Sequence, residues 1–530
     1  MIRTSLHPLD VVIIVLYLAM LACVGVYFSR RQKTLDEYFL AKQSMAWLPV
    51  GLSLMAALDS AIDYLMQPSA TIRYGLFLLM GTSSWLFLYP WVAKVTLPFY
   101  RRLNYFTAYE YLEARFDVRV RALAAVIFIV WRLGWMATAI YVPSLAISTA
   151  TGGRLRVEYL VIVLGAIVTL YTMLGGIEAV IWNDVAQFCV RFGGLAAVVA
   201  IAAGAAGGFS RIWTIASAAG KTSAIAPVDF SSLRAFFYQP LNVVAIVVSI
   251  VLGRMASYTS DQIMVQRLQT TKSLKDARQA FIVNAAGDAI WMFALSFVGL
   301  ALFAFFQSRP LPRDFETDKI LPYFMSMTFP AGIVGLVIAS IMAASLSSVD
   351  SAINSCTSVL VIDIYNRLIR GTETVRQAAG KRAGADTAAR EVFVSRIATA
   401  GFGVLGTILA MNVSKIGSLL EIANKLINAF SGPLFGIYIL AMFSRRATAA
   451  GALVAGVVGS LTSYYVAYMS HIGFMWPATL GCAATVAVGL VSSIVVPGAP
   501  SAGALQLTWW SVMAMPEPRP AEARIPTPHG

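Results

Sequence analysis

The chain has 530 residues, of which 58% are hydrophobic and 12% are charged, and its mean hydropathy is +0.73. A soluble globular domain carries about 25% charged residues, so this composition excludes an ordinary soluble protein and predicts a polytopic helical membrane protein. A net charge of +14 would suggest a nucleic-acid partner in a soluble chain. Here we attribute it to basic residues on the cytoplasmic side of a membrane, and we expect no nucleic-acid partner.

Thirteen apolar runs follow one another along the chain, each long enough to cross a bilayer about 30 Å thick. We predict spans at 9–29, 46–67, 74–98, 120–146, 157–175, 178–204, 238–258, 280–306, 330–362, 393–412, 416–443, 448–469 and 474–496. The tail at 497–530 is rich in proline and alanine. We expect it to be a disordered cytoplasmic segment that carries no folded soluble domain.

Basic residues orient the predicted spans. They gather after the first, third, seventh, ninth and eleventh spans, in clusters that include Arg30, Arg101, Arg267, Arg367 and Arg445. With thirteen spans these loops share one side, and the positive-inside rule makes that side the cytoplasm. The N-terminus is then outside and the C-terminus inside, and we expect a plasma membrane location, in a bacterium the inner membrane.

Five motifs in chain order carry a resemblance to a known family. They are DEYFLAKQSMAWLPVGLSL at 36–54, YTMLGGIEAVIWNDVAQF at 171–188, SDQIMVQR at 260–267, AASLSSVDSAINS with VIDIY at 343–365, and SGPLFGIYILAMFSRRATAAGALVAG at 431–456. Together they resemble the sodium:solute symporter family. TAYEYLEARF and YVPSLAI are most similar to its branch for monocarboxylates, iodide and carboxylated vitamins.

The resemblance implies an all-α LeuT-type fold in a transporter domain at 1–496. Two inverted repeats of five helices would lie at 46–204 and 238–443. An extra helix at 9–29 would precede them, and two extra helices at 448–496 would follow.

Two predicted spans carry interruptions at matching positions of the two repeats. The second span contains LDSAID and Pro68, and the seventh contains GRMASYTSD at 253–261. Paired discontinuous helices mark the substrate and ion sites of transporters. Because a charged side chain inside the bilayer costs several kcal/mol, we expect Asp59 and Asp63 of the first interruption to be functional.

The resemblance also implies a sodium site between the second and ninth spans. Its ligands would be backbone carbonyls and two hydroxyl groups, from Ala56, Asp59, Ala344, Ser347 and Ser348. Hard cations prefer such oxygen ligands. Small serines also serve close helix packing in membranes, and this alternative stays open. Sodium is expected as the coupling ion, with no other cofactor.

Two more acids within predicted spans are candidates for a second ion site or a proton site. Asp184 matches a family aspartate associated with ion passage toward the cytoplasm, and its alternative is an ion pair with Arg191. Asp350 lies three residues beyond Ser347. The Asp59 side chain departs from the family pattern, so it is a further candidate to hold a cation or a proton.

The predicted substrate site gathers polar and charged residues of the spans, namely Ser60, Asp63, Gln67, Arg132, Arg254, Ser257, Asp288 and Lys425. In related sugar carriers the position of Arg254 is polar and neutral, and that of Asp288 is basic. An arginine fork suits bidentate capture of a carboxylate, which favours an organic anion. The alternative is a set of structural ion pairs, such as Arg254 with Asp288 and Lys425 with Asp63.

We therefore predict a sodium-coupled symporter that imports a small organic anion by alternating access, with the solute, sodium and the bilayer as partners and no obligate protein partner. One alternative is a carrier of an amino acid, betaine or other zwitterion or cation, in which Asp63 faces the positive group. It could use either a proton or sodium as the coupling ion. A transporter-fold sensor is the other. The sequence contains no P-loop, metalloenzyme or nucleophile motif, so no enzymatic activity is expected.

Overall fold

The computed structural model describes residues 6–29, 43–103, 105, 107–173, 177–312, 315–369, 385–495 and 500–516. Arg30, residues 36–42 of the first family motif, residues 174–176 of the second, and 497–499 and 517–530 of the tail lie outside this set. Over the described residues the regular elements are all helical, with one isolated bridge between Met45 and Thr271. The predicted all-α class is confirmed.

The first half of the chain forms α1 (Pro8–Ser29), α3 (Trp47–Leu58), α4 (Ala61–Tyr74), η2 (Phe77–Ser83), α5 (Ser84–Trp91), η3 (Val92–Thr96), α6 (Leu97–Leu103), α7 (Ala108–Arg115), α8 (Val118–Ala150), α9 (Val157–Thr172) and α10 (Ile177–Ala205). Two short helices, α11 (Phe209–Ala218) and α12 (Leu233–Tyr238), connect the halves.

The second half begins with α13 (Val243–Ser260), α14 (Gln262–Gln269), α15 (Leu274–Gln307), η4 (Thr317–Lys319), α16 (Ile320–Thr328), α17 (Ile333–Val359) and η5 (Leu360–Ile369). It continues with α19 (Ala385–Ala410), η6 (Val413–Lys415), α20 (Leu419–Ile422), η7 (Ala423–Asn428), α21 (Ser431–Phe443), α22 (Ala449–Tyr468), α23 (Pro477–Val495), α24 (Ala502–Gln506) and α25 (Trp509–Ala514).

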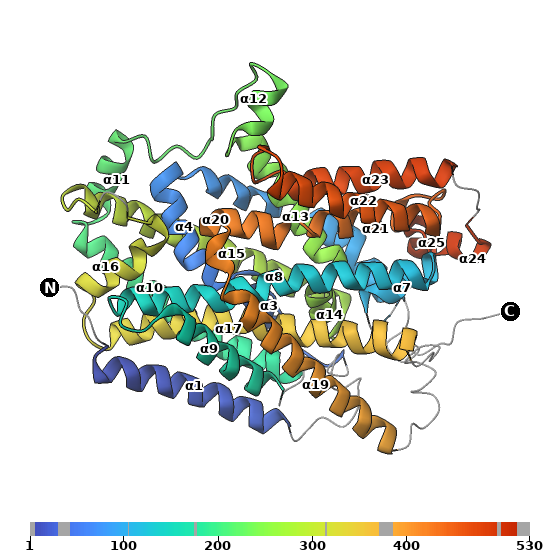
Figure 1. The fold of residues 1–530 in the computed structure, drawn as a ribbon, viewed down its shortest axis with the longest axis horizontal. Coiled ribbons are helices and arrows are strands. Elements are labelled where there is room, and N and C mark those ends of the chain that lie inside the picture. Colours follow the sequence, from blue (N-terminus) through green and yellow to red (C-terminus); the bar gives the residue numbers. More distant parts are fainter. Residues whose placement is uncertain are drawn as a thin grey trace.

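Helices occupy all thirteen predicted runs, but they differ in length. Within the described part of the chain, eight helices are long and apolar enough to cross a membrane, or nine when the bent pair α3 and α4 counts as one span. Figure 1 shows the long helices running side by side, with α3, α8 and α17 inside, α1, α9 and α19 along one edge, and α22 and α23 along the opposite edge. Nearly all of α17 is buried, against α10, α8 and α1.

The predicted interruption of the second span is confirmed at Asp59 and Ser60. Here α3 ends and α4 begins, and their axes differ by 59°. Ser60 starts α4 as its N-cap, because its Oγ accepts from the Ile62 N–H (3.2 Å) and its own N–H donates to Asp63 Oδ2 (2.9 Å). Pro68, expected to add to the break, lies inside α4. Its backbone packs on Gly299 of α15, where a Cβ would approach the Pro68 carbonyl to 3.0 Å.

The second interruption is narrower than predicted. Helix α13 runs unbroken through Gly253 to Ser260, and only Asp261 adopts an extended conformation between α13 and α14. The hydroxyls of Ser257 and Ser260 donate to carbonyls one turn earlier, so these polar residues are satisfied within the helix. Asp261 Oδ1 accepts from the Ile263 N–H (3.0 Å) and caps α14.

Part of the predicted disordered tail is structured. Helices α24 and α25 pack on the end of the bundle that carries α6 and α7. The Tyr111 hydroxyl donates to the Leu507 carbonyl (3.1 Å), and the Trp509 ring lies 6.0 Å from that of Phe443. For residues 502–514 the expectation of disorder does not hold, because aromatic anchors fix this segment against the helices.

Candidate functional site

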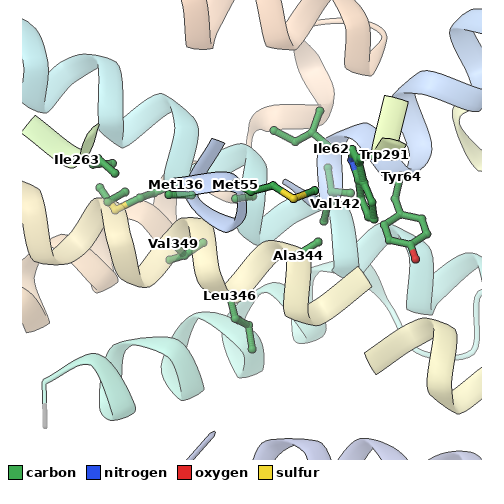
Figure 2. Packing of buried hydrophobic residues seen from close by; sticks show 14 of the residues in the cluster. Met55, Ile62, Tyr64, Met136, Val142, Ile263, Trp291, Ala344, Leu346 and Val349 are labelled. Atoms are coloured by element: carbon green, nitrogen blue, oxygen red, sulfur yellow. The ribbon is translucent and has the colours of Figure 1, made fainter. Parts of the chain in front are cut away.

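Four of the five predicted sodium ligands converge where α3 ends against α17. Ser347 Oγ lies 3.1 Å from the Ala56 carbonyl oxygen and 3.3 Å from that of Ala344, and Ser348 Oγ lies 3.4 and 3.3 Å from the same two oxygens. All four residues are buried. Figure 2 shows Ala344 on this stretch of α17, among the buried side chains around the break. Asp59, the fifth predicted ligand, is the C-cap of α3.

The break itself makes the Ala56 carbonyl available. In a continuous helix the N–H of Ser60 would donate to the carbonyl of Ala56, four residues earlier. Here the Ser60 N–H donates to Asp63 instead. The capping interaction of α4 therefore frees an oxygen at the end of α3, directly opposite two serine hydroxyls.

The Asp59 side chain faces an arginine that was not predicted as a site residue. Its Oδ2 lies 3.5 Å from Nη2 of Arg191 on α10, and both residues are buried, with 3% and 1% of their surface exposed. The Arg191 guanidinium lies 4.1 Å from the ring centre of Trp291 on α15. The alternative pairing of Arg191 with Asp184 is not the arrangement found, because Arg191 pairs with Asp59.

Asp184 belongs to a separate cluster that joins α3, α10, α14 and α17. Its Oδ2 accepts from Ser53 Oγ (2.6 Å) and pairs with Arg267 Nη2 (3.2 Å). Arg267 also donates to Ser53 and to Ser351. Arg267, which the sequence placed among the basic residues between the seventh and eighth spans, has a fully buried side chain. Its position in SDQIMVQR, six residues after Asp261 of the second interruption, was the available signal.

Asp350, the other candidate for a second ion site, lies beside this cluster. The Tyr171 hydroxyl donates to its Oδ2 (3.2 Å), and Ser351 Oγ donates to its Oδ1 (3.3 Å). Asp184 acts on it electrostatically. The structure thus places the two acids predicted for a second ion near each other, with Arg267 as the counter-charge.

Arg254 and Asp288 form the ion pair that the sequence left open. Arg254 Nη2 lies 2.7 Å from Asp288 Oδ2, and Nη1 donates to Ser84 Oγ (3.0 Å). Trp85 completes the group, because its Nε1 donates to the same Asp288 oxygen (2.5 Å) and its ring centre lies 4.1 Å from the guanidinium. Asp288 is also a charged neighbour of Asp59, so this pair borders the break.

Arg132 has a different partner from the other predicted substrate residues. It pairs with Asp261, the cap of α14, and its guanidinium is 4.4 Å and 5.1 Å from the ring centres of Trp131 and Trp135. Asp261 was not predicted, although it stands in the quoted SDQIMVQR motif. Arg132 thus ties α8 to the second interruption.

The other predicted substrate residues have local partners. Gln67 Nε2 donates to Ser296 Oγ (2.9 Å), and Ser257 Oγ donates within α13 to Gly253 (3.1 Å). Lys425 lies in η7, where its carbonyl accepts from the Tyr468 hydroxyl (3.3 Å). Over the described residues no ion pair joins Lys425 to Asp63.

The C-terminal part of α4 is held by contacts with η4 and α20. Asp318 of η4 accepts from Ser69 Oγ (2.6 Å) on α4 and from the Leu419 N–H (2.9 Å) of α20. Arg73 Nη2 lies 3.9 Å from Asp318. The Ser53–Asp184–Arg267 cluster holds α3 in the same way, so contacts with neighbouring elements fix both half-helices.

Outside the spans, a charged cluster joins α7 to the ends of α8 and η5. Glu113 Oε1 accepts from Arg367 Nε (2.7 Å) and Oε2 accepts from Arg121 Nη1 (2.8 Å). Partial burial acts to raise the pKa of Glu113, but the hydrogen bonds from Arg367 and Arg121 outweigh burial and hold it below its ordinary value.

Comparison with known proteins places this geometry in one family. Residues 38–459 match the sodium:solute symporter family. The chain is 30% identical over 482 residues to the sodium/sialic acid symporter SiaT of Proteus mirabilis, covering 90% of this chain and 93% of the relative. It is 30% identical to a sodium-dependent multivitamin transporter of Oryctolagus cuniculus (88% and 71% covered) and 28% identical to the human sodium-coupled monocarboxylate transporter 1 (86% and 73%).

A solved structure extends the likeness to the fold. A substrate-bound, outward-open Na⁺-coupled sialic acid symporter superposes with a TM-score of 0.81 at 29% identity, covering 93% of this chain and 99% of that one. The nucleobase–cation symporter Mhp1, at 13% identity and a TM-score of 0.56, is similar in fold alone. These likenesses confirm the fold type that the motifs imply.

Proposed function

This chain belongs to the sodium:solute symporter family, and we propose that it imports a small carboxylated organic solute by alternating access. Its family and relatives make it a sodium-coupled solute symporter and an integral membrane protein, with sodium as coupling ion, and not an enzyme. We propose the class of solute, the inward direction of transport and the residues of the site.

The observation that carries the proposal is the cluster of four oxygens at the α3–α4 break. Two carbonyls of different helices face two hydroxyls within 3.1–3.4 Å. A sodium ion held by this cluster would draw α3 toward α17 and stabilise the break. When the ion leaves, α3 loses that link and the inner side can open, which couples ion release to solute release.

We propose that the solute binds beside the ion, against α4, α13 and α15. These helices carry six of the predicted substrate residues: Ser60, Asp63, Gln67, Arg254, Ser257 and Asp288. Arg132 pairs with Asp261 and Lys425 lies in η7, outside these three helices, and we leave both out of the binding surface. Relatives named for sialic acid and monocarboxylates support a carboxylated solute.

A zwitterion is the second candidate, and the charges around the break favour it. With all three carboxyl groups ionised, Asp59, Asp63 and Asp288 exceed Arg191 and Arg254 by one charge. One bound sodium would balance a zwitterionic solute, whereas an anionic solute requires a second cation for the same balance. The number of sodium ions moved per solute therefore separates the two candidates.

For topology we propose the thirteen spans of the sequence, with the N-terminus outside and the C-terminus inside a plasma membrane, in a bacterium the inner one. The two inverted repeats would be 46–204 and 238–443. The basic ends of α6 and η5 support a cytoplasmic location for that end of the bundle.

Purified protein reconstituted into vesicles tests the function. With an imposed sodium gradient, we expect uptake of sialic acid or lactate that stops when choline replaces sodium. Uptake of an amino acid in preference to every carboxylate would support the zwitterion. Full uptake driven by a proton gradient without sodium would refute sodium coupling.

A further inference from the structure

Arg191 is an unusual buried cation in this structure. None of its three guanidinium nitrogens has a hydrogen-bond partner among the described residues, although only 1% of the residue is exposed. Its position is nevertheless fixed. The Tyr64 hydroxyl (3.2 Å) and Ser340 Oγ (2.9 Å) both donate to the Arg191 carbonyl, and the guanidinium rests on Trp291.

Two other fully buried arginines, Arg267 and Arg115, show how this chain satisfies most of such a group, although Arg115 Nη1 and Arg132 Nε also lack a partner. Arg267 donates to Ser53, Asp184 and Ser351. Arg115 donates from Nε and Nη2 to the carbonyls that end α21. A buried guanidinium without hydrogen bonds is costly, so Arg191 stands apart as a group held ready for a ligand.

One oxygen of the acid that faces Arg191 is also unsatisfied. Asp59 Oδ2 also lacks a hydrogen-bond partner, and its distance of 3.5 Å from Arg191 Nη2 is too long for a charge-assisted hydrogen bond. The two groups attract each other without closing a bidentate pair. Donors on one side and an acceptor on the other are therefore left available at the break.

The rings around Arg191 define the kind of group that fits. Trp291 lies beneath the guanidinium, Tyr64 meets Trp291 edge to face at 4.8 Å, and Phe192 lies 5.7 Å from Trp291. Figure 2 shows Tyr64 and Trp291 together next to Ile62. An apolar wall behind a cation strengthens its attraction for an anion by excluding water, and a planar fork matches a carboxylate.

We propose that Arg191 binds the carboxylate of the transported solute, and that this contact releases Asp59 to strengthen sodium binding at Ala56, Ser347 and Ser348. The inference rests on the proposed carboxylated solute. It gives a physical reason for coupling, because the solute takes over the cation that holds Asp59. The freed carboxylate lies three residues beyond Ala56, at the same end of α3.

The test compares Arg191→Met with the unchanged protein, using sialic acid and lactate and the methyl ester of each. Binding to purified protein is measured in sodium. We expect Arg191→Met to lower the affinity for each carboxylate at least tenfold, about 1.4 kcal/mol, and to leave ester affinity within threefold. In the unchanged protein the carboxylate, but not the ester, should raise sodium affinity. Arg191→Met should lose this effect.

Arg115→Met is the matched control, since it also removes a buried arginine but far from the break. It should lower thermal stability without changing the ratio of carboxylate to ester affinity. If Arg191→Met fails to fold, the double variant Arg191→Met with Asp59→Leu removes both charges. We expect it to fold and still to bind the carboxylate at least tenfold more weakly.

The outcomes separate the inference from the proposed function. If the unchanged protein binds no carboxylate in sodium, both fall. If it does, and Arg191→Met or the double variant keeps its affinity for the carboxylate, the proposed function stands and the role of Arg191 is refuted. A loss confined to the carboxylates supports both.

Discussion

The paired substitution of Ser347→Ala and Ser348→Ala gives the sharpest test of the ion site. Both hydroxyls lie 3.1–3.4 Å from carbonyls, which is long for hydrogen bonds between such oxygens. Each bond therefore contributes at the low end of about 0.5–1.5 kcal/mol to folding. A sodium ion would lose two of its ligands, which we expect to cost at least about 1.4 kcal/mol, a tenfold loss of affinity.

Sodium binding is measured by radioactive sodium and by the thermal shift that sodium causes relative to choline. Ser345→Ala is the matched control, because Ser345 is a buried serine of the same helix that donates instead to the Ala139 carbonyl. We expect the paired variant to bind sodium at least tenfold more weakly and Ser345→Ala to bind it normally. Sodium affinity of the paired variant within threefold of the unchanged protein would refute the site and leave the serines as packing residues.

Three further predictions follow from the charged residues. Asp59→Asn should lower sodium affinity most when a carboxylated solute is bound, and an unchanged sodium titration with solute would exclude the side chain from the ion site. Arg254→Gln should destabilise the protein because it leaves the buried Asp288 carboxylate without its ion-pair partner. The double variant with Asp288→Asn should restore stability. If the double variant also transports the same solute, Arg254 is only an ion-pair partner. The pKa of Glu113 is held below its ordinary value, so its contribution to stability is complete above about pH 4.3 and is lost as the pH falls below that. Glu113→Gln should therefore make thermal stability less dependent on pH between about pH 5 and 3. An unaltered pH profile of thermal stability would contradict this.

The structure brings four of the predicted sodium ligands together, and three of them lie in one continuous local pattern. Ser347 and Ser348 stand inside a long motif on one helix, and Ala344 lies one turn earlier. The family resemblance supplied the sodium role of these residues and the facing positions on the second span. The break was also visible, and the spacing of Ser60 and Asp63 fits a capping box, a signal that would have fixed its position at Asp59.

Partner choice among buried charges was the part that sequence could not fix. Hydropathy places a residue along a span but leaves the rotation of the helix open. Asp184 and Arg191 share a face of α10, yet seven residues rise about 10 Å along a helix, too far for a direct ion pair. Instead, Asp184 pairs with Arg267 of α14, and Arg191 pairs with Asp59 at the end of α3.

Gly253 shows the opposite error, in which a local signal was given too much weight. A glycine inside a helix costs about 1 kcal/mol relative to alanine, and we expected the chain to break there. Helix α13 continues through Gly253 and packs against α21 and α5. The interruption moved to Asp261, whose side chain replaces the missing hydrogen bond at the start of α14.

The cap at Ser60 connects the local chemistry of the chain to its coupling. Asp63 was predicted to face the solute, but one of its oxygens is engaged by the Ser60 N–H. That engagement leaves the Ala56 carbonyl without its helical donor, and Ser347 and Ser348 meet it there. A short polar sequence within an apolar span thus starts a helix, exposes an ion ligand and leaves Asp59 beside Arg191. Asp59 and Asp63 therefore act on different parts of the same break, because Asp59 ends α3 and Asp63 caps the start of α4.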